Sequence, residues 1–181
     1  AIYSEKGNLS YREFFSHAYN AAEVISRYVP ERTAVAVLVE KSVELFISAN
    51  AIVLSNRIYA PLDNELPTET AVECIRAMNA SAVIADKEWS KRLKDKYQLK
   101  VLEVDELMPD NAKEADFREM SSSPDDIFCI IHTSGSTGRP KGVGIRQYGL
   151  MSCLSYTNEI FGTTSDDCTL AITNHCHDMS L

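Results

Sequence analysis

The sequence alternates between short, almost wholly apolar runs and segments with helical periodicity, and this alternation limits the folds that it can adopt. The apolar runs lie at 33–39, 58–60, 82–85, 101–104 and 127–131. A strand that is apolar on both faces fits the interior of a parallel sheet, which helices cover on each side. The alternation therefore predicts an α/β domain with a layered, largely parallel sheet flanked by helices.

The helical segments have recognisable starts and stops. Ser10 and Glu13 form a capping-box pattern, and apolar residues follow them at helical spacing as far as Pro30. Further helices are expected at 41–55, 71–78 and 86–95, whereas 105–126 is interpreted as a surface connection with room for one short helical turn. The residues expected in the central sheet are Val35, Val37, Val83, Ile84, Ile130 and Ile131.

Composition excludes several classes of partner. Eighteen basic and 26 acidic residues give a formal net charge of -8, which disfavours nucleic acid and anionic membranes. No apolar run approaches the roughly 18 residues of a membrane-spanning helix, and no signal-peptide pattern opens the chain. The five cysteines are scattered without a CxxC pair, as is typical of reduced thiols in a cytoplasmic protein. Cys129, between apolar neighbours, is expected to be a small buried hydrophobe.

The run TSGSTG at 133–138 consists of hydroxyl residues and glycines, and it follows the apolar strand at 127–131. Glycines let backbone N–H groups approach an anion, hydroxyls add donors, and a lysine supplies positive charge. A flexible surface turn is the alternative, but the preceding strand and the following Arg-Pro-Lys disfavour it. Because Gly142 follows Lys141, the run is not a Walker A motif. The predicted phosphate-binding residues are Thr133, Ser134, Gly135, Ser136, Thr137, Gly138 and Lys141.

The run TSGSTGRPKGV at 133–143 resembles the phosphate loop of the adenylate-forming superfamily, which comprises acyl- and aryl-CoA synthetases, luciferases and adenylation domains of nonribosomal peptide synthetases. NLSYREF at 8–14 is similar to the opening strand and helix of that superfamily, and YAPLD at 59–63 to an early block of the peptide synthetases. The resemblance spans nearly the whole chain and is weakest between 86 and 125. Two positions depart from the family pattern, because His132 stands at a usually aromatic position and Gln147 at a usual histidine.

The resemblance implies the fold of the N-terminal subdomain of an adenylate-forming enzyme. Residues 1–181 are accordingly expected to be the N-terminal part of an AMP-binding adenylation domain, truncated before the rest of that domain. No catalytic residue is assignable within them, and the fragment alone is expected to be inactive.

The run HDMS at 177–180 resembles the Phe-Asp-x-Ser block of amino-acid-activating domains. In that block the aspartate pairs with the α-ammonium group of the substrate, which implies a substrate-binding role for Asp178. A plain surface or helix-capping aspartate is the alternative. A zinc site is disfavoured, because strand alternation puts His175 and His177 on one face and Cys176 and Asp178 on the other. No metal site is therefore expected among these residues.

The implied activity is the ATP- and Mg²⁺-dependent conversion of an amino acid into its aminoacyl-adenylate. The implied partners are a carrier domain bearing phosphopantetheine and the remainder of the adenylation domain, with nonribosomal peptide synthesis as the setting. Two alternatives stay open: an acyl- or aryl-acid:CoA ligase, which needs no acid to receive an ammonium group, and a non-catalytic nucleotide-binding module.

Overall fold

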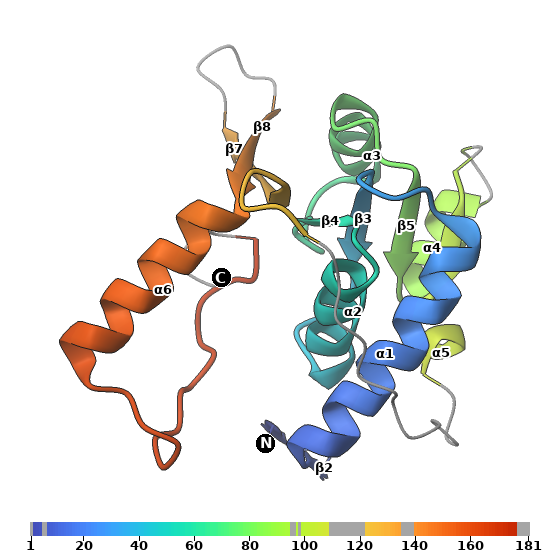
Figure 1. The fold of residues 1–181 in the computed structure, drawn as a ribbon. Helices are drawn as coiled ribbons and strands as arrows, with labels where there is room; N and C mark the ends of the chain where they lie inside the picture. The colour runs from blue at the N-terminus through green and yellow to red at the C-terminus, as the bar shows by residue number, and fades with distance from the viewer. Residues whose placement is uncertain are drawn as a thin grey trace.

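A six-stranded sheet in the order β6-β5-β3-β4-β7-β8 organises the computed structural model, which describes residues 2–4, 7–94, 97, 99–108, 122–134 and 140–176 (Figure 1). The first five strands in this order run parallel, and β8 runs antiparallel to β7. The predicted largely parallel sheet is thus confirmed. The strands are β3 (Ala34–Leu38), β4 (Ile58–Pro61), β5 (Ala82–Ala85), β6 (Val101–Glu103), β7 (Ile127–Ser134) and β8 (Pro140–Arg146).

Helices cover both faces of this sheet, as the alternation in the sequence predicts. Val35 and Val37 of β3 join one core cluster with α1 and α2, while Ala36 and Leu38 join a second cluster with α3 and α4. A small antiparallel hairpin of β1 (Ile2–Ser4) and β2 (Gly7–Leu9) precedes α1. The helices are α1 (Tyr11–Tyr28), α2 (Val43–Leu54), α3 (Thr68–Ala77), α4 (Lys87–Lys94), α5 (Val104–Leu107) and α6 (Gln147–Phe161).

The predicted capping box begins α1. The Ser10 backbone N–H donates to Glu13 Oε2 at 2.8 Å, and the Glu13 N–H donates to Ser10 Oγ at 3.3 Å. The pKa of Glu13 is lowered by the Ser10 N–H and by the Ser10 hydroxyl, which donates to the same carboxylate oxygen at 2.7 Å. The helix ends at Tyr28, just before the predicted stop at Pro30.

Three local predictions from the sequence need correction. The strand expected at 58–60 continues through Pro61, because the next ladder bond comes from the Leu62 N–H to the Val37 carbonyl at 2.9 Å. Val104 was expected to end a strand and instead begins α5. Thr133 and the backbone of Ser134 belong to β7 rather than to a loop. The six predicted sheet residues all lie in β3, β5 or β7.

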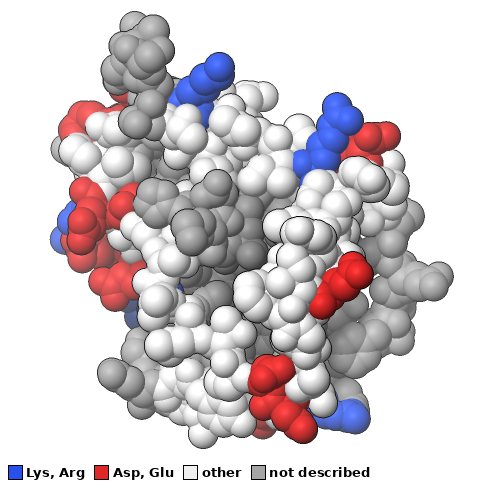
Figure 2. Space-filling view, turned by 90° about the vertical axis from the view of Figure 1, so that its left-hand side faces the viewer, with Lys and Arg blue, Asp and Glu red and all other residues white. Residues whose placement is uncertain are grey.

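The helix α6 was not anticipated, and none of its 15 residues is buried. Its face of the molecule carries few charged side chains (Figure 2). Large apolar side chains are exposed along it, namely Tyr148, Met151, Leu154, Tyr156, Ile160 and Phe161. None of the helices in the described part of the chain is long and apolar enough to cross a membrane.

A buried arginine ties the end of α1 to the start of β4. Arg57 is 8% exposed, and its Nε donates to the Val29 carbonyl at 3.0 Å. The same guanidinium donates to the Ser55 carbonyl and to Ser26 Oγ. Burial lowers the pKa of Arg57, and the nearby carboxylate of Glu31 opposes that shift. The guanidinium therefore donates hydrogen bonds to backbone carbonyls just after α1 and just after α2.

Replacing Arg57 by methionine should lower the free energy of unfolding by about 1–3 kcal/mol, because buried carbonyl oxygens lose their donors. Urea denaturation monitored by circular dichroism measures this change. Arg27→Met, at an exposed position of α1, is the matched control and should stay within about 0.5 kcal/mol of the wild type. Equal effects of the two substitutions would contradict the structural role of Arg57.

Candidate functional site

Two of the predicted phosphate-binding residues, Thr133 and Lys141, lie in the hairpin of β7 and β8, which forms one edge of the sheet next to α6 (Figure 1). In the parallel pairing of β4 with β7, Tyr59 lies opposite Cys129. Since β4 ends at Pro61 and β7 at Ser134, β7 continues past the carboxyl end of β4. The carboxyl ends of strands in open α/β sheets are where ligands bind.

The register of the hairpin brings two of the predicted residues together. Thr133 lies opposite Lys141, and Ser134 lies opposite Pro140. Thr133 Oγ1 donates to the Lys141 carbonyl at 3.4 Å, and both residues are exposed. A hydroxyl and a lysine side by side at the end of a strand suit an anionic ligand. Gly135, Ser136, Thr137 and Gly138 lie outside the described residues, as do the side chains of Ser134 and Pro140.

His132, one of the two departures from the family pattern, lies opposite Gly142 in the hairpin. A Cβ atom at Gly142 would lie 3.0 Å from Ile130 Cγ2 and 3.6 Å from His132 Nε2, so the glycine leaves room for both side chains. Both ring nitrogens of His132 are buried and have no hydrogen-bond partner among the described residues. Burial lowers the pKa of His132, which favours the neutral form of this imidazole within the hairpin.

Cys129 is fully buried in the core, as predicted, and burial raises the pKa of its thiol to about 12. A thiol with so high a pKa is a poor nucleophile near neutral pH. Cys129 therefore serves as a small apolar residue of the core. Gln147, the second departure from the family pattern, is the first residue of α6, and its N–H donates to the Asp126 carbonyl at 2.9 Å.

A second group of residues lies at the carboxyl ends of β3 and β4, where residues 173–176 pack. Lys41 Nζ, after β3, donates to the Thr173 carbonyl at 2.7 Å. Asn174 Nδ2 donates to Asp63 Oδ2, after β4, at 3.0 Å. Asp63 lies in the YAPLD run that was recognised in the sequence. Nothing in the sequence indicates that Asn174 is its partner, because the two residues are 111 positions apart.

The residues that follow this segment include the predicted substrate residue. Asp178, together with His177, lies outside the described residues. Within the described part of the chain, no cluster of three or more His, Cys, Asp or Glu side chains is placed to hold a metal ion. His175 instead forms a hydrogen bond with the backbone of Leu62, and burial is the main reason that its pKa is lowered.

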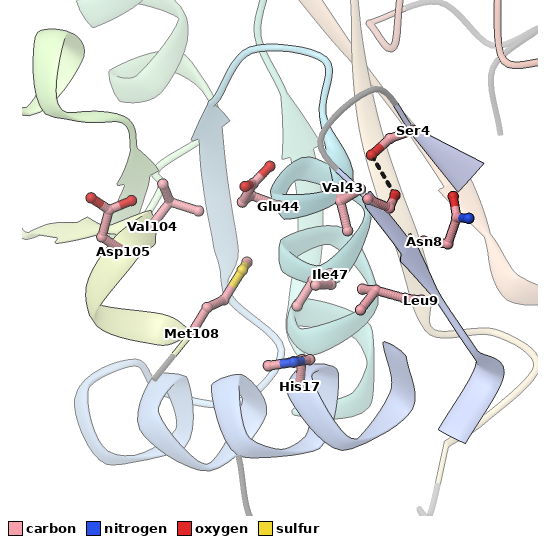
Figure 3. A pocket seen from close by; sticks show the side chains of 11 residues that line it. Ser4, Asn8, Leu9, His17, Val43, Glu44, Ile47, Val104, Asp105 and Met108 are labelled. Atoms are coloured by element: carbon pink, nitrogen blue, oxygen red, sulfur yellow. Dashed lines mark hydrogen bonds between the residues drawn. The ribbon is translucent and has the colours of Figure 1, made fainter. Parts of the chain in front are cut away.

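A cavity of about 590 Å³ lies elsewhere, between the β1–β2 hairpin, α1, α2 and α5 (Figure 3). Its wall includes Leu9, Ile47 and Met108, with the carboxylates of Glu44 and Asp105 as its acidic groups. Among the described residues that line it there is no lysine or arginine. A polyphosphate would meet like charge there, so the β7–β8 hairpin is the better candidate for a nucleotide.

Comparison with known proteins identifies the family of this chain. Residues 1–181 match the family described as AMP-binding enzyme. Tyrocidine synthase 1 from Brevibacillus parabrevis is 30% identical over 169 residues, which are 92% of this chain and 15% of that protein. The match over the whole chain is sufficient to assign it: the chain belongs to the AMP-binding enzyme family.

Two solved structures extend the comparison. The nonribosomal peptide synthetase FmoA3 (S1046A), in its α-methyl-L-serine-AMP bound form, has a TM-score of 0.84 and 25% identity, and the match covers 99% of this chain and 20% of FmoA3. The N-terminal subdomain of Klebsiella oxytoca NpsA, in complex with 3-hydroxybenzoyl-AMSN, has a TM-score of 0.77 and 26% identity. This match covers 98% of this chain and 43% of the NpsA chain. The chain thus spans less than half of the relatives that it matches here. The expected fold of the N-terminal subdomain of an adenylate-forming enzyme is confirmed.

Replacing His132 by phenylalanine should make stability less sensitive to acid. The unfolded chain binds a proton on this histidine below about pH 6.5, whereas the folded chain does so only at lower pH. Unfolding therefore takes up a proton as the pH falls, and the free energy of unfolding decreases. Urea denaturation at pH 7.5 and pH 5.5 should show a smaller decrease in H132F than in the wild type. An unchanged decrease would contradict a neutral, buried His132.

Proposed function

We propose that this chain is the N-terminal part of an adenylation domain that activates an amino acid as its aminoacyl-adenylate in nonribosomal peptide synthesis. The observation that carries the proposal is the β7–β8 hairpin, which places Thr133 opposite Lys141 past the end of a parallel strand, in a chain of the AMP-binding enzyme family. The similarity to tyrocidine synthase 1 and to FmoA3 supports the setting.

The proposed reaction is a displacement at the α-phosphorus of ATP. One oxygen of the substrate carboxylate bonds to that phosphorus while the bond to the leaving pyrophosphate breaks. Such chemistry depends mainly on positioning and on neutralising the phosphate charge. Thr133 and Lys141, with the loop residues 134–138, would hold the β- and γ-phosphates, and Mg²⁺ would neutralise charge on the same oxygens. The product acyl group would pass to the phosphopantetheine thiol of a carrier domain.

The substrate carboxylate is proposed to be that of an amino acid. Asp178 supports this choice, because a carboxylate in a partly desolvated pocket pairs well with an α-ammonium group. It follows Cys176 by two positions, and partial burial near Tyr59 raises the pKa of the Cys176 thiol to about 12. An aryl-acid ligase is the second candidate, and the likeness to NpsA bound to a 3-hydroxybenzoyl compound favours it.

The exposed face of α6 supports the proposal that further parts of an adenylation domain pack on this chain. Six large apolar side chains on one helix without a buried residue are unusual for a finished surface. The solved relatives are more than twice the length that this chain matches. The 181 residues alone are therefore proposed to lack adenylation activity.

Replacing Lys141 by methionine in the intact protein should raise the KM for ATP or lower kcat by about tenfold to a hundredfold in total, because a charge-assisted contact is worth roughly 1.5–3 kcal/mol. ATP–pyrophosphate exchange measures the effect. Lys91→Met, at an exposed position of α4, is the matched control and should leave exchange unchanged. Similar activity in the two variants would remove Lys141 from the phosphate site.

Exchange by the intact protein over a panel of amino acids and simple carboxylic acids tests the substrate class. We expect exchange with one or a few amino acids, and a loss of about tenfold or more in amino-acid affinity in D178A, because the α-ammonium group loses its charged partner. Exchange only with acids that lack an amino group, unaffected by D178A, would establish the second candidate. No exchange with any acid, from a folded protein, would indicate a non-catalytic module.

A further inference from the structure

The cavity of about 590 Å³ lies at an edge of the sheet where strands end (Figure 3). Residues at the start of α2, which follows β3, and at the start of α5, which follows β6, line it. Since β3, β5 and β6 run parallel, the carboxyl ends of β3 and β6 lie at one edge. Small molecules bind at that edge in open α/β sheets, and the volume is within the range of ligand sites. Neither Thr133 nor Lys141 lines the cavity, so the proposed function leaves it without a role.

One part of the cavity wall is apolar. The residues that form this part are Leu9, Val43, Ile47, Val104 and Met108. Ile47 is 3% exposed, and it packs in one cluster with Leu9, Val43 and Met108. An alkyl or aryl group that entered the cavity would exchange water for this apolar surface, which favours binding. The apolar part of the wall therefore suits a ligand with an apolar body.

Glu44 is the main charged group of the wall. It lies in the first turn of α2, its side chain extends toward Val104 and Met108 (Figure 3), and its Oε2 is buried. The second carboxylate of the wall belongs to Asp105, whose Oδ2 is paired with Lys87 Nζ at 2.8 Å. Because water screens a buried charge less, Glu44 attracts a cation in the cavity more strongly than an exposed carboxylate would.

The other polar side chains of the wall do not change this balance of charge. Among its described residues there is no lysine or arginine, so the charge that they carry is mainly that of carboxylates. Asn8 and His17 add polar atoms, and Nδ1 of His17 is buried and has no hydrogen-bond partner among the described residues. Phosphate and carboxylate groups would be repelled here, which disfavours nucleotides and amino acids as ligands.

We propose that this cavity binds a small organic amine as its ammonium ion, with the charged group at Glu44 and an alkyl or aryl body against Ile47 and Met108. The acidic and apolar parts of the wall match the two parts of such a ligand. The amine carries no carboxylate, which distinguishes it from the amino acid of the proposed reaction. The inference does not depend on the proposed function, because binding in this cavity requires no adenylation.

The experiment is isothermal titration calorimetry of the intact protein with 2-phenylethylamine near neutral pH. The matched probe is 2-phenylethanol, which has a similar shape and no charge. The amine should bind about tenfold more tightly than the alcohol, because only the amine forms a charge-assisted contact with Glu44. In Glu44→Gln the affinity for the amine should fall about tenfold, while the affinity for the alcohol should change by less than about twofold.

Two further variants test the charge and the location. Glu69→Gln is the matched control, because Glu69 is also an acidic residue in the first turn of a helix but is exposed and does not line the cavity. Its affinity for the amine should stay within about twofold of the wild type. Val43→Phe places a larger side chain in the wall and reduces the space for a ligand, so the affinities for the amine and the alcohol should both fall about tenfold.

Each other outcome would overturn the inference. A wild type that binds neither probe would show that the cavity takes no such ligand or is filled by another part of the intact protein. Equal affinities for the amine and the alcohol, or equal amine affinities in Glu44→Gln and Glu69→Gln, would remove Glu44 from the site. Amine binding that Val43→Phe leaves unchanged would place the amine elsewhere. Thermal unfolding checks that each variant is folded, and ATP–pyrophosphate exchange can fail without altering these results.

Discussion

Burial of β3 on both faces is the constraint on which the rest of the structure depends. Every residue of this strand is buried, with Val35 and Val37 packed toward α1 and α2 and with Ala36 and Leu38 packed toward α3 and α4. A strand without a polar face cannot lie at a surface, so helices must cover both sides of the sheet. Crossover connections through helices leave β3 parallel to its neighbours β4 and β5. The shared direction of β3 and β4 brings Lys41 and Asp63, which follow them, to one edge.

The parts of the structure that the sequence predicts well are those with a strong local pattern. Apolar runs predict β3 and β5, and Ser10 with Glu13 predicts the start of α1, because caps and buried strands depend on neighbouring residues. The end of β7 was misjudged, because Thr133 and Ser134 look like loop residues and become a strand only through pairing with β8. That return strand contains Pro140 and two glycines, residues that are poor strand formers by themselves.

Other features have no local pattern at all. The pairing of Asp63 with Asn174 joins residues 111 positions apart, and only the folded chain brings them together. The apolar side chains of α6 stay exposed in the described part of the chain. Burial against that part therefore does not explain why a helix forms there. The same holds for the residues of the candidate site. Lys141 was recognised because it belongs to a contiguous motif, whereas Lys41 and Asn174 make only long-range contacts and were not recognised.

The strand β4 connects the two halves of the candidate site. Its Tyr59 pairs with Cys129 of β7, the strand that leads to the proposed phosphate loop, and lies near Cys176 of the segment that leads to Asp178. Burial, with smaller effects from both cysteines, raises the pKa of Tyr59, so the phenol stays neutral between them. Just beyond the strand, Leu62 and Asp63 hold residues 174–176. A shift of β4 would therefore move both halves together. Under the proposed function, this one short buried strand sets the distance between the segment proposed to bind ATP and the segment that leads to Asp178.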